Sequence, residues 1–351
     1  MAGLPLTDEL FDRSAITMPG GDRLHYELVL EAYRSWAAEN PARNAEEFLA
    51  DVFDGRVRTP TSCERLVFWG MAPQLKRQDV APGVPPTIPW AWAVQAIQLR
   101  LAEPRWRRGP QAFDRNSSSL RYKAVLLSRP ECHAHIEFWR ALRTRFDVRG
   151  VITTNYDLTA ERAMRDRRAA GAAAFAYHYA AFDGNVRPVN SPYLRDRSRS
   201  TTPGGPVALA KLHGSLNWSA EGNELVIYPD FRPVWRHGGT AAIVPPLPEK
   251  RVPSWLAPIW SAADGVLASA HTWIVIGYSL PPYDLAVREL LGRASGEGCV
   301  DTVLLVDPQW RSLLRRWRDV APHALVEGFD DLASATLQIR SLPHAAAADA
   351  A

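Results

Sequence analysis

Three apolar runs in this sequence end abruptly on small or polar residues whose types could do chemistry. The runs cover 151–157, 209–215 and 273–281, and the residues at their ends are Asn155 and Asp157, His213, and Gly277 and Ser279. An amide side chain both donates and accepts hydrogen bonds, and an imidazole can accept a proton near neutral pH. The combination is suited to holding a polar ligand while a hydroxyl group or a water loses a proton.

Each of these residues also has a simpler explanation. An Asn-x-Asp sequence after a strand commonly forms a turn, because both side chains bond nearby backbone. His213 could be a structural histidine, and Ser279, which is followed by Leu-Pro-Pro, could cap the next helix. Tyr156 and Trp218 are expected to be packing residues. The case for a site therefore depends on the three runs occurring together.

The pattern around the runs predicts an α/β fold. A buried strand is predicted to begin at residue 151, further strands at 207–212, 273–276, 302–306 and 325–326, and helices at 158–164, 255–270, 284–294 and 310–319. Such alternation is typical of a Rossmann-like, doubly wound, mostly parallel sheet. In an open sheet of this kind, ligands bind where strand carboxyl ends meet helix N-termini. Asn155 and Asp157 would then stand at the lip of the pocket.

The residues before the first run are predicted to be mostly helical, with helices at 24–39, 44–54 and 90–103. We therefore expect a single domain over 1–344, with a helical insertion at about 20–150 and a Rossmann-like core at 151–344. Another helix is expected to begin after Thr7 as its N-cap. The segment 169–205 loses periodicity and is expected to be a long crossover or lid. The alanine-rich end, 345–351, is expected to be a disordered tail.

Composition excludes several classes of function. The net charge of +3 is small and the basic clusters are short, so no nucleic-acid partner is expected. The three cysteines are far apart and form no C-x-x-C pair, which argues against a zinc site and a disulfide framework. No apolar run reaches the roughly 18 residues needed to span a bilayer, and no signal sequence opens the chain. A cytoplasmic protein without a membrane partner is expected.

The motifs at the ends of the three runs resemble those of the sirtuin-like NAD-consuming family. The matching stretches are Thr153-Thr-Asn-Tyr-Asp157, Leu212-His-Gly-Ser215 and Gly277-Tyr-Ser-Leu280, and they occur in the family's order. They look most like the zinc-free bacterial branch, which includes NAD-hydrolysing effectors of anti-phage defence. The likeness covers most of the chain after residue 150, together with Ala2-Gly-Leu-Pro5.

The resemblance implies a role for each matching residue. Asn155 would orient the water or the ribose hydroxyls, and His213 would be the general base. Asp157 would contact the carboxamide of nicotinamide, and Asp307 would accept a hydrogen bond from the adenosine ribose. The remaining residues implied to contact NAD are Thr154, Gly214, Gly277 and Ser279. NAD would be a substrate and no zinc would be needed.

Two departures from the family pattern keep alternatives open. The opening strand and its Gly-Ala-Gly loop, which should precede Ala2-Gly-Leu-Pro5, are absent. Either the true start lies upstream or a wall of the nucleotide site has been lost. The paired C-x-x-C module of the deacylating relatives is also absent, and Thr154 stands where those relatives usually have Gln.

The expected activity is therefore NAD⁺ hydrolysis to nicotinamide and ADP-ribose, in an anti-phage defence effector. An inactive module that senses NAD or ADP-ribose is the first alternative, and an NAD-dependent protein deacylase is the second. A second copy of the chain and a protein of the same defence system are the candidate protein partners.

Overall fold

The structure is a computed structural model that describes residues 22–60, 86–102, 130–165, 177–179, 186–188, 207–221, 224–227, 241–245 and 252–342. Its helices are α1 (Asp22–Glu39), α2 (Ala45–Phe53), α5 (Trp90–Ala102), α7 (Pro130–Arg145), α8 (Thr159–Arg165), α10 (Ala257–Ala268), α11 (Leu285–Glu297), α12 (Trp310–Val320) and α13 (Leu332–Ser341). Its strands are β1 (Gly150–Thr153), β2 (Tyr177–Tyr179), β3 (Val186–Pro188), β4 (Val207–Lys211), β5 (Gly214–Glu221), β6 (Glu224–Ile227), β7 (Ala241–Ile243), β8 (Thr272–Ile276), β9 (Thr302–Val306) and β10 (Leu325–Phe329).

Two of the sheets are small and entirely parallel. Their strand orders are β1-β4-β2 and β10-β9-β8. In the first, Gly150 lies opposite Ala208, and in the second, Thr272 lies opposite Thr302. The predicted α/β class with parallel strands is thus confirmed. The single sheet expected from the sequence differs from what the described residues form, because β1 and β8 are each hydrogen-bonded on one side only.

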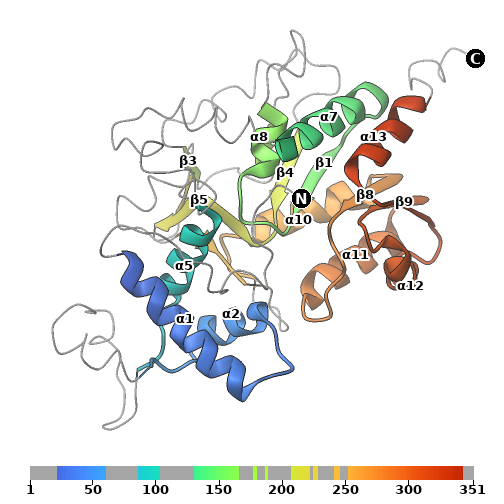
Figure 1. The fold of residues 1–351 in the computed structure, drawn as a ribbon. Helices are drawn as coiled ribbons and strands as arrows, with labels where there is room; N and C mark the ends of the chain where they lie inside the picture. Colours follow the sequence, from blue (N-terminus) through green and yellow to red (C-terminus); the bar gives the residue numbers. More distant parts are fainter. Residues whose placement is uncertain are drawn as a thin grey trace, which may run out of the picture.

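Helices connect these two parallel sheets. In α10, Val266 packs against Gly150 of β1, and the carbonyl of Leu267 accepts a hydrogen bond of 3.2 Å from the indole of Trp273 in β8. Helices α7 and α13 lie side by side (Figure 1), and Arg340 of α13 bonds Glu137 of α7. One hydrophobic core accordingly runs through α7, α10 to α13, and the two parallel sheets.

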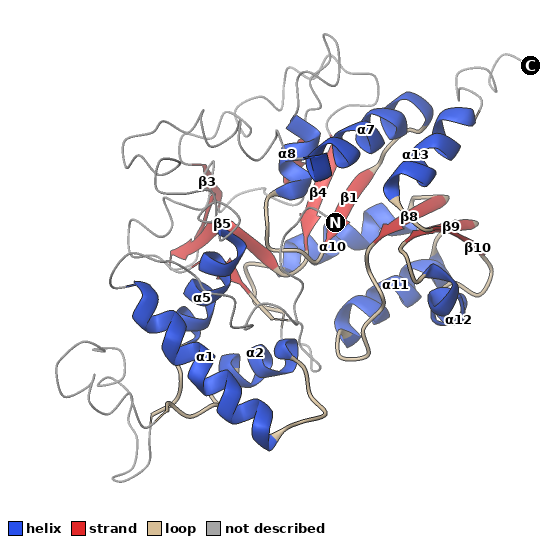
Figure 2. Cartoon of the chain, in the orientation of Figure 1, coloured by secondary structure: helices blue, strands red, loops and turns tan. Residues whose placement is uncertain are grey.

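The third sheet, of order β3-β6-β5-β7, is mixed and packs against the N-terminal helices. Figure 2 shows β5 running from beside α5 towards the parallel sheet that contains β1 and β4. A second core joins α1, α2 and α5 to Leu216, Val226 and Ile243 of this sheet. The helical segment and the segment after residue 207 therefore share a core, although they are distant in sequence.

Several sequence predictions can be placed against these elements. The predicted helices at 24–39, 44–54, 90–103, 255–270 and 310–319 match α1, α2, α5, α10 and α12 to within two residues at each end. Helix α7 falls in the segment predicted as an insertion, yet it packs in the same core as α13. The predicted lid at 169–205 contains the short strands β2 and β3. Its other residues, the predicted Thr7 helix and the predicted tail at 345–351 lie outside the described residues.

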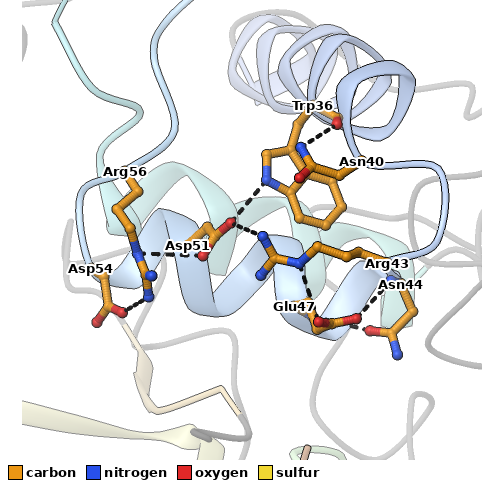
Figure 3. Close-up of polar contacts among 8 residues, drawn as sticks. All are labelled: Trp36, Asn40, Arg43, Asn44, Glu47, Asp51, Asp54 and Arg56. Carbon is orange, nitrogen blue, oxygen red and sulfur yellow. Dashed lines mark hydrogen bonds and ion pairs between the residues drawn. The ribbon is translucent and has the colours of Figure 1, made fainter. Parts of the chain in front are cut away.

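A polar network holds α1 and α2 together (Figure 3). Asp51, which is 6% exposed, accepts hydrogen bonds from the indole of Trp36 at 3.0 Å and from Arg43 at 2.8 Å. Arg56 approaches the other carboxyl oxygen at 3.3 Å. Asn44 caps α2 in a reciprocal capping box with Glu47, which fixes where that helix begins. Asp51 of α2 is therefore the acceptor on which donors from α1 and from the segments on either side of α2 converge.

We expect Asp51→Ala to lower the free energy of unfolding by about 1–3 kcal/mol, because the buried indole N–H of Trp36 and the guanidinium of Arg43 lose their acceptor. Asp54→Ala removes an exposed ion-pair partner of Arg56 and should change the free energy of unfolding by at most about 1 kcal/mol. Urea unfolding of the two variants measures the difference. Equal losses would contradict a central role for Asp51.

Candidate active site

The first motif forms a loop that is clamped between β1 and β5. The amide of Leu212 donates to the carbonyl of Thr153 at 2.9 Å, and the amide of Leu216 donates to the carbonyl of Tyr156 at 3.0 Å. The amide of Asn155 donates to the hydroxyl of Thr153 at 3.1 Å. The loop 154–157 is thus held at the carboxyl end of β1, beside the start of β5.

His213 follows β4 at the same edge of the sheet, where it is 4% exposed. Its carbonyl accepts from the amide of Val244 at 2.9 Å, and the indole of Trp260 donates to the preceding carbonyl, that of Leu212, at 2.9 Å. The ring of Tyr156 lies 6.2 Å from the imidazole, centroid to centroid. The first two motifs therefore meet around His213.

Asp284, the residue before α11, connects His213 to the third motif. Its Oδ1 lies 3.6 Å from His213 Nε2, and its Oδ2 accepts from the hydroxyl of Tyr278 at 2.8 Å. Asp284 is 1% exposed. Burial and the nearby charge of Asp284 raise the pKa of Tyr278 well above its ordinary value. This hydroxyl therefore stays protonated and donates a hydrogen bond to Asp284. The sequence analysis did not identify Asp284 as a site residue.

A small pocket opens beside these two buried groups. It is lined by His213 and Asp284 together with apolar wall residues, which are Val244, Pro245, Val252, Pro253, Leu256, Trp260 and Ala286. The empty space beside these residues is about 280 Å³, a figure that includes open solvent. An imidazole and a carboxyl group at the end of an apolar pocket can orient a ligand and exchange a proton with it.

Asn155 and Asp157 have different surroundings in the structure. The Asn155 side chain is exposed, next to Tyr156 in the loop that meets His213. The Asp157 carboxyl accepts from the amide of Thr159 at 2.6 Å, and its carbonyl accepts from Lys211. The Asp157 side chain thus stabilises the turn into α8, which is the simpler explanation of an Asn-x-Asp sequence. Thr154 is half-buried in the same loop.

The other residues implied to bind NAD lie at strand ends of the second parallel sheet. Gly277 follows β8 with φ +63°, and the space where a Cβ would stand is open to 4 Å. Ser279 is exposed, and its carbonyl accepts from Arg316 at 3.3 Å. The Asp307 carboxyl accepts from the amide of Gln309 at 2.7 Å and so stabilises the turn into α12. Gly277 is the one of these three whose surroundings leave room for close backbone approach.

Gly214 is required by the packing of strands. Its φ is +81°, and a Cβ there would lie 2.0 Å from the carbonyl oxygen of Ala242 in β7. We expect Gly214→Ala to destabilise the protein severely, because the added carbon meets backbone and not a movable side chain. Gly277→Ala should cost only about 1–2 kcal/mol for its left-handed backbone. Thermal unfolding of the two variants measures the difference. Similar losses of stability in both would contradict the close approach of β7 to Gly214.

A buried ion pair lies below the first loop. Lys211 Nζ is 3.0 Å from Glu161 Oε1, and both side chains are at most 1% exposed. The same ammonium donates to the carbonyl of Asp157. Lys211 therefore ties β4 to α8 and to the loop that carries Asn155, which the sequence analysis did not foresee.

His135 on α7 gives the protein a specific pH dependence. Burial lowers the pKa of His135 more than the charge of Asp157 raises it. The unfolded chain then binds the proton more readily, so stability should fall as the pH drops from about 7.5 through the ordinary histidine value near 6.5. His135→Gln should show a smaller loss of melting temperature over this range, and the exposed His323→Gln should behave like the wild type. The melting temperatures from pH 7.5 to 5.5 test this.

Comparison with protein-family models and with curated proteins finds no match to this chain. Within the part of the chain that the structure describes, no three His, Cys, Asp or Glu side chains gather as metal ligands would. Among the helices with described positions, none is long and apolar enough to cross a membrane.

Proposed function

We propose that this protein is a sirtuin-like NAD⁺ glycohydrolase that releases nicotinamide and ADP-ribose as an effector of anti-phage defence. The observation that carries the proposal is the chain of contacts from Tyr156 through His213 and Asp284 to Tyr278. It unites the three strand-end motifs whose order resembles that family. A reaction that breaks a glycosidic bond needs a base beside a ligand pocket, and His213 meets that requirement.

The proposed reaction assigns simple steps to these residues. The bond between the pyridine nitrogen and ribose C1′ breaks, and its electron pair stays on the nitrogen of nicotinamide. Water then attacks the oxocarbenium-like C1′ and loses a proton to His213. The sum is NAD⁺ and water giving nicotinamide, ADP-ribose and a proton. Asn155 orients the water or the ribose hydroxyls, and Gly277 lets the protein backbone approach the dinucleotide closely.

In the Rossmann-like fold that we propose, the two parallel sheets are parts of one larger sheet. Both β1 and β8 have an edge without a strand partner among the described residues, and α10 packs against both. A further parallel strand and a Gly-rich loop between these edges would complete a doubly wound sheet. Such a loop would also supply backbone amides for the pyrophosphate.

The test is to incubate the purified protein with NAD and follow free nicotinamide by chromatography. We expect nicotinamide and ADP-ribose in equal amounts. Absence of nicotinamide release would overturn the proposed activity. Light scattering of the same samples would show whether the active form contains a second copy of the chain.

The engagement of Asp157 and Asp307 in local turns favours a second candidate, a module that binds NAD or ADP-ribose without cleaving it. Calorimetry would then show binding that persists in His213→Ala, with no turnover by the wild type. The remaining alternative, a deacylase, requires NAD-dependent loss of acyl groups from a peptide. Mass spectrometry of an acylated peptide in the same incubation tests it.

A further inference from the structure

One buried acceptor in the pocket has no hydrogen-bond partner among the described residues. This is Oδ1 of Asp284, which lies 3.6 Å from His213 Nε2, beyond hydrogen-bonding distance. The other oxygen, Oδ2, is occupied by the hydroxyl of Tyr278. A buried carboxyl oxygen without a donor is costly, so a ligand that supplies an N–H would be favoured there.

The rest of the pocket restricts what can bring that N–H. Its walls are Val244, Pro245, Val252, Pro253, Leu256, Trp260 and Ala286, which offer apolar surface. A flat ring with a neutral amide matches this combination, because the ring buries apolar area and the amide nitrogen donates. A ring with a negative carboxylate does not match, since it would place like charges together.

We propose that Asp284, and not Asp157, binds the carboxamide nitrogen of nicotinamide. The proposal rests on the proposed function for the identity of the ring. Asp157 is a poorer candidate because its carboxyl already stabilises the turn into α8 through the amide of Thr159. Asp284 in contrast lies in the pocket wall with a vacant oxygen and with His213 beside it. The pocket then selects the neutral amide over the acid.

The experiment measures binding of nicotinamide and of nicotinate to the purified chain by ligand-observed NMR. The wild type should bind nicotinamide at least about tenfold more tightly than nicotinate. Asp284→Asn keeps the shape but turns an N–H towards the ligand, so this preference should shrink about tenfold or reverse. Asp157→Asn should leave the preference unchanged, because asparagine can still accept from Thr159.

A third variant checks the location. Val252→Phe places a larger ring at the half-buried rim of the pocket and should abolish nicotinamide binding. Circular dichroism confirms that each variant is folded, and the wild-type preference and Val252→Phe still test the proposal should Asp284→Asn unfold. Equal binding of amide and acid, a preference that follows Asp157, or binding undisturbed by Val252→Phe would each overturn it.

The proposed activity and this assignment can fail separately. If the protein releases nicotinamide from NAD but its preference for the amide is unchanged in Asp284→Asn, the proposed hydrolase activity stands and the role of Asp284 is wrong. If the preference for the amide depends on Asp284 but NAD is not cleaved, the role of Asp284 stands and the proposed hydrolase activity is wrong.

Discussion

Replacing His213 with alanine is expected to lower the rate of nicotinamide release by about 10²- to 10⁴-fold, the usual contribution of a positioned general base. The imidazole is buried next to Asp284 at the pocket, and a methyl group can neither accept the proton nor hold the water. The KM for NAD should change far less, because the lost interaction belongs to the transition state. Steady-state kinetics of the folded variant measure both constants.

His271 offers a matched control. It pairs with Asp301 at 3.5 Å, nearly the His213–Asp284 distance, but the two side chains are 73% and 67% exposed. His271→Ala should therefore retain the wild-type rate. A His213→Ala enzyme that still hydrolysed NAD at the wild-type rate would show that another group is the base.

Lys211→Met is expected to lower the free energy of unfolding by about 3–5 kcal/mol, because the buried Glu161 loses the ammonium group that lies 3.0 Å from its carboxylate. The carbonyl of Asp157 loses a donor in the same substitution, so the loop that carries Asn155 should loosen. Replacing both partners, as Lys211→Met with Glu161→Leu, removes the stranded charge and should recover much of the loss. Urea unfolding of the single and double variants gives these values.

The exposed pair of Arg293 and Asp264 provides the comparison, with the same kind of contact at 3.1 Å. Arg293→Met should change the free energy of unfolding by no more than about 1 kcal/mol. A double variant of the buried pair that is less stable than the Lys211→Met single variant would contradict the stranded-charge explanation.

The sequence predicted the positions of the site better than its contacts. The abrupt ends of apolar runs identified His213 and the loops around it, since such breaks are local and visible in one dimension. Asp284 escaped because an aspartate before a helix is indistinguishable from an ordinary N-cap. The turn that brings it back to His213 includes Leu280, a buried leucine with φ +52°, and that conformation is set by packing. For Asp157 the sequence allowed both a turn residue and a ligand-binding residue, and the structure shows its carboxyl in the turn into α8.

In the fold, too, local features were predicted better than contacts between segments that are distant in the sequence. Helices such as α5 and α12 were predicted to within a residue or two. The pairing of α13 with α7 was not predicted, because it joins segments that are about 200 residues apart in the sequence. Within the mixed sheet, β5 was not predicted as a strand.

The pairing of α7 with α13 also bears on the order of events during synthesis. The two residues of its ion pair are 203 positions apart. At about 5–20 residues per second, a ribosome needs roughly 10–40 s to travel from one to the other. Until then α7 and the strands beside it lack the last helix of their shared core, so the nascent chain must be kept from aggregating. The core that α7 shares with α13 can therefore form only after both segments have been synthesised.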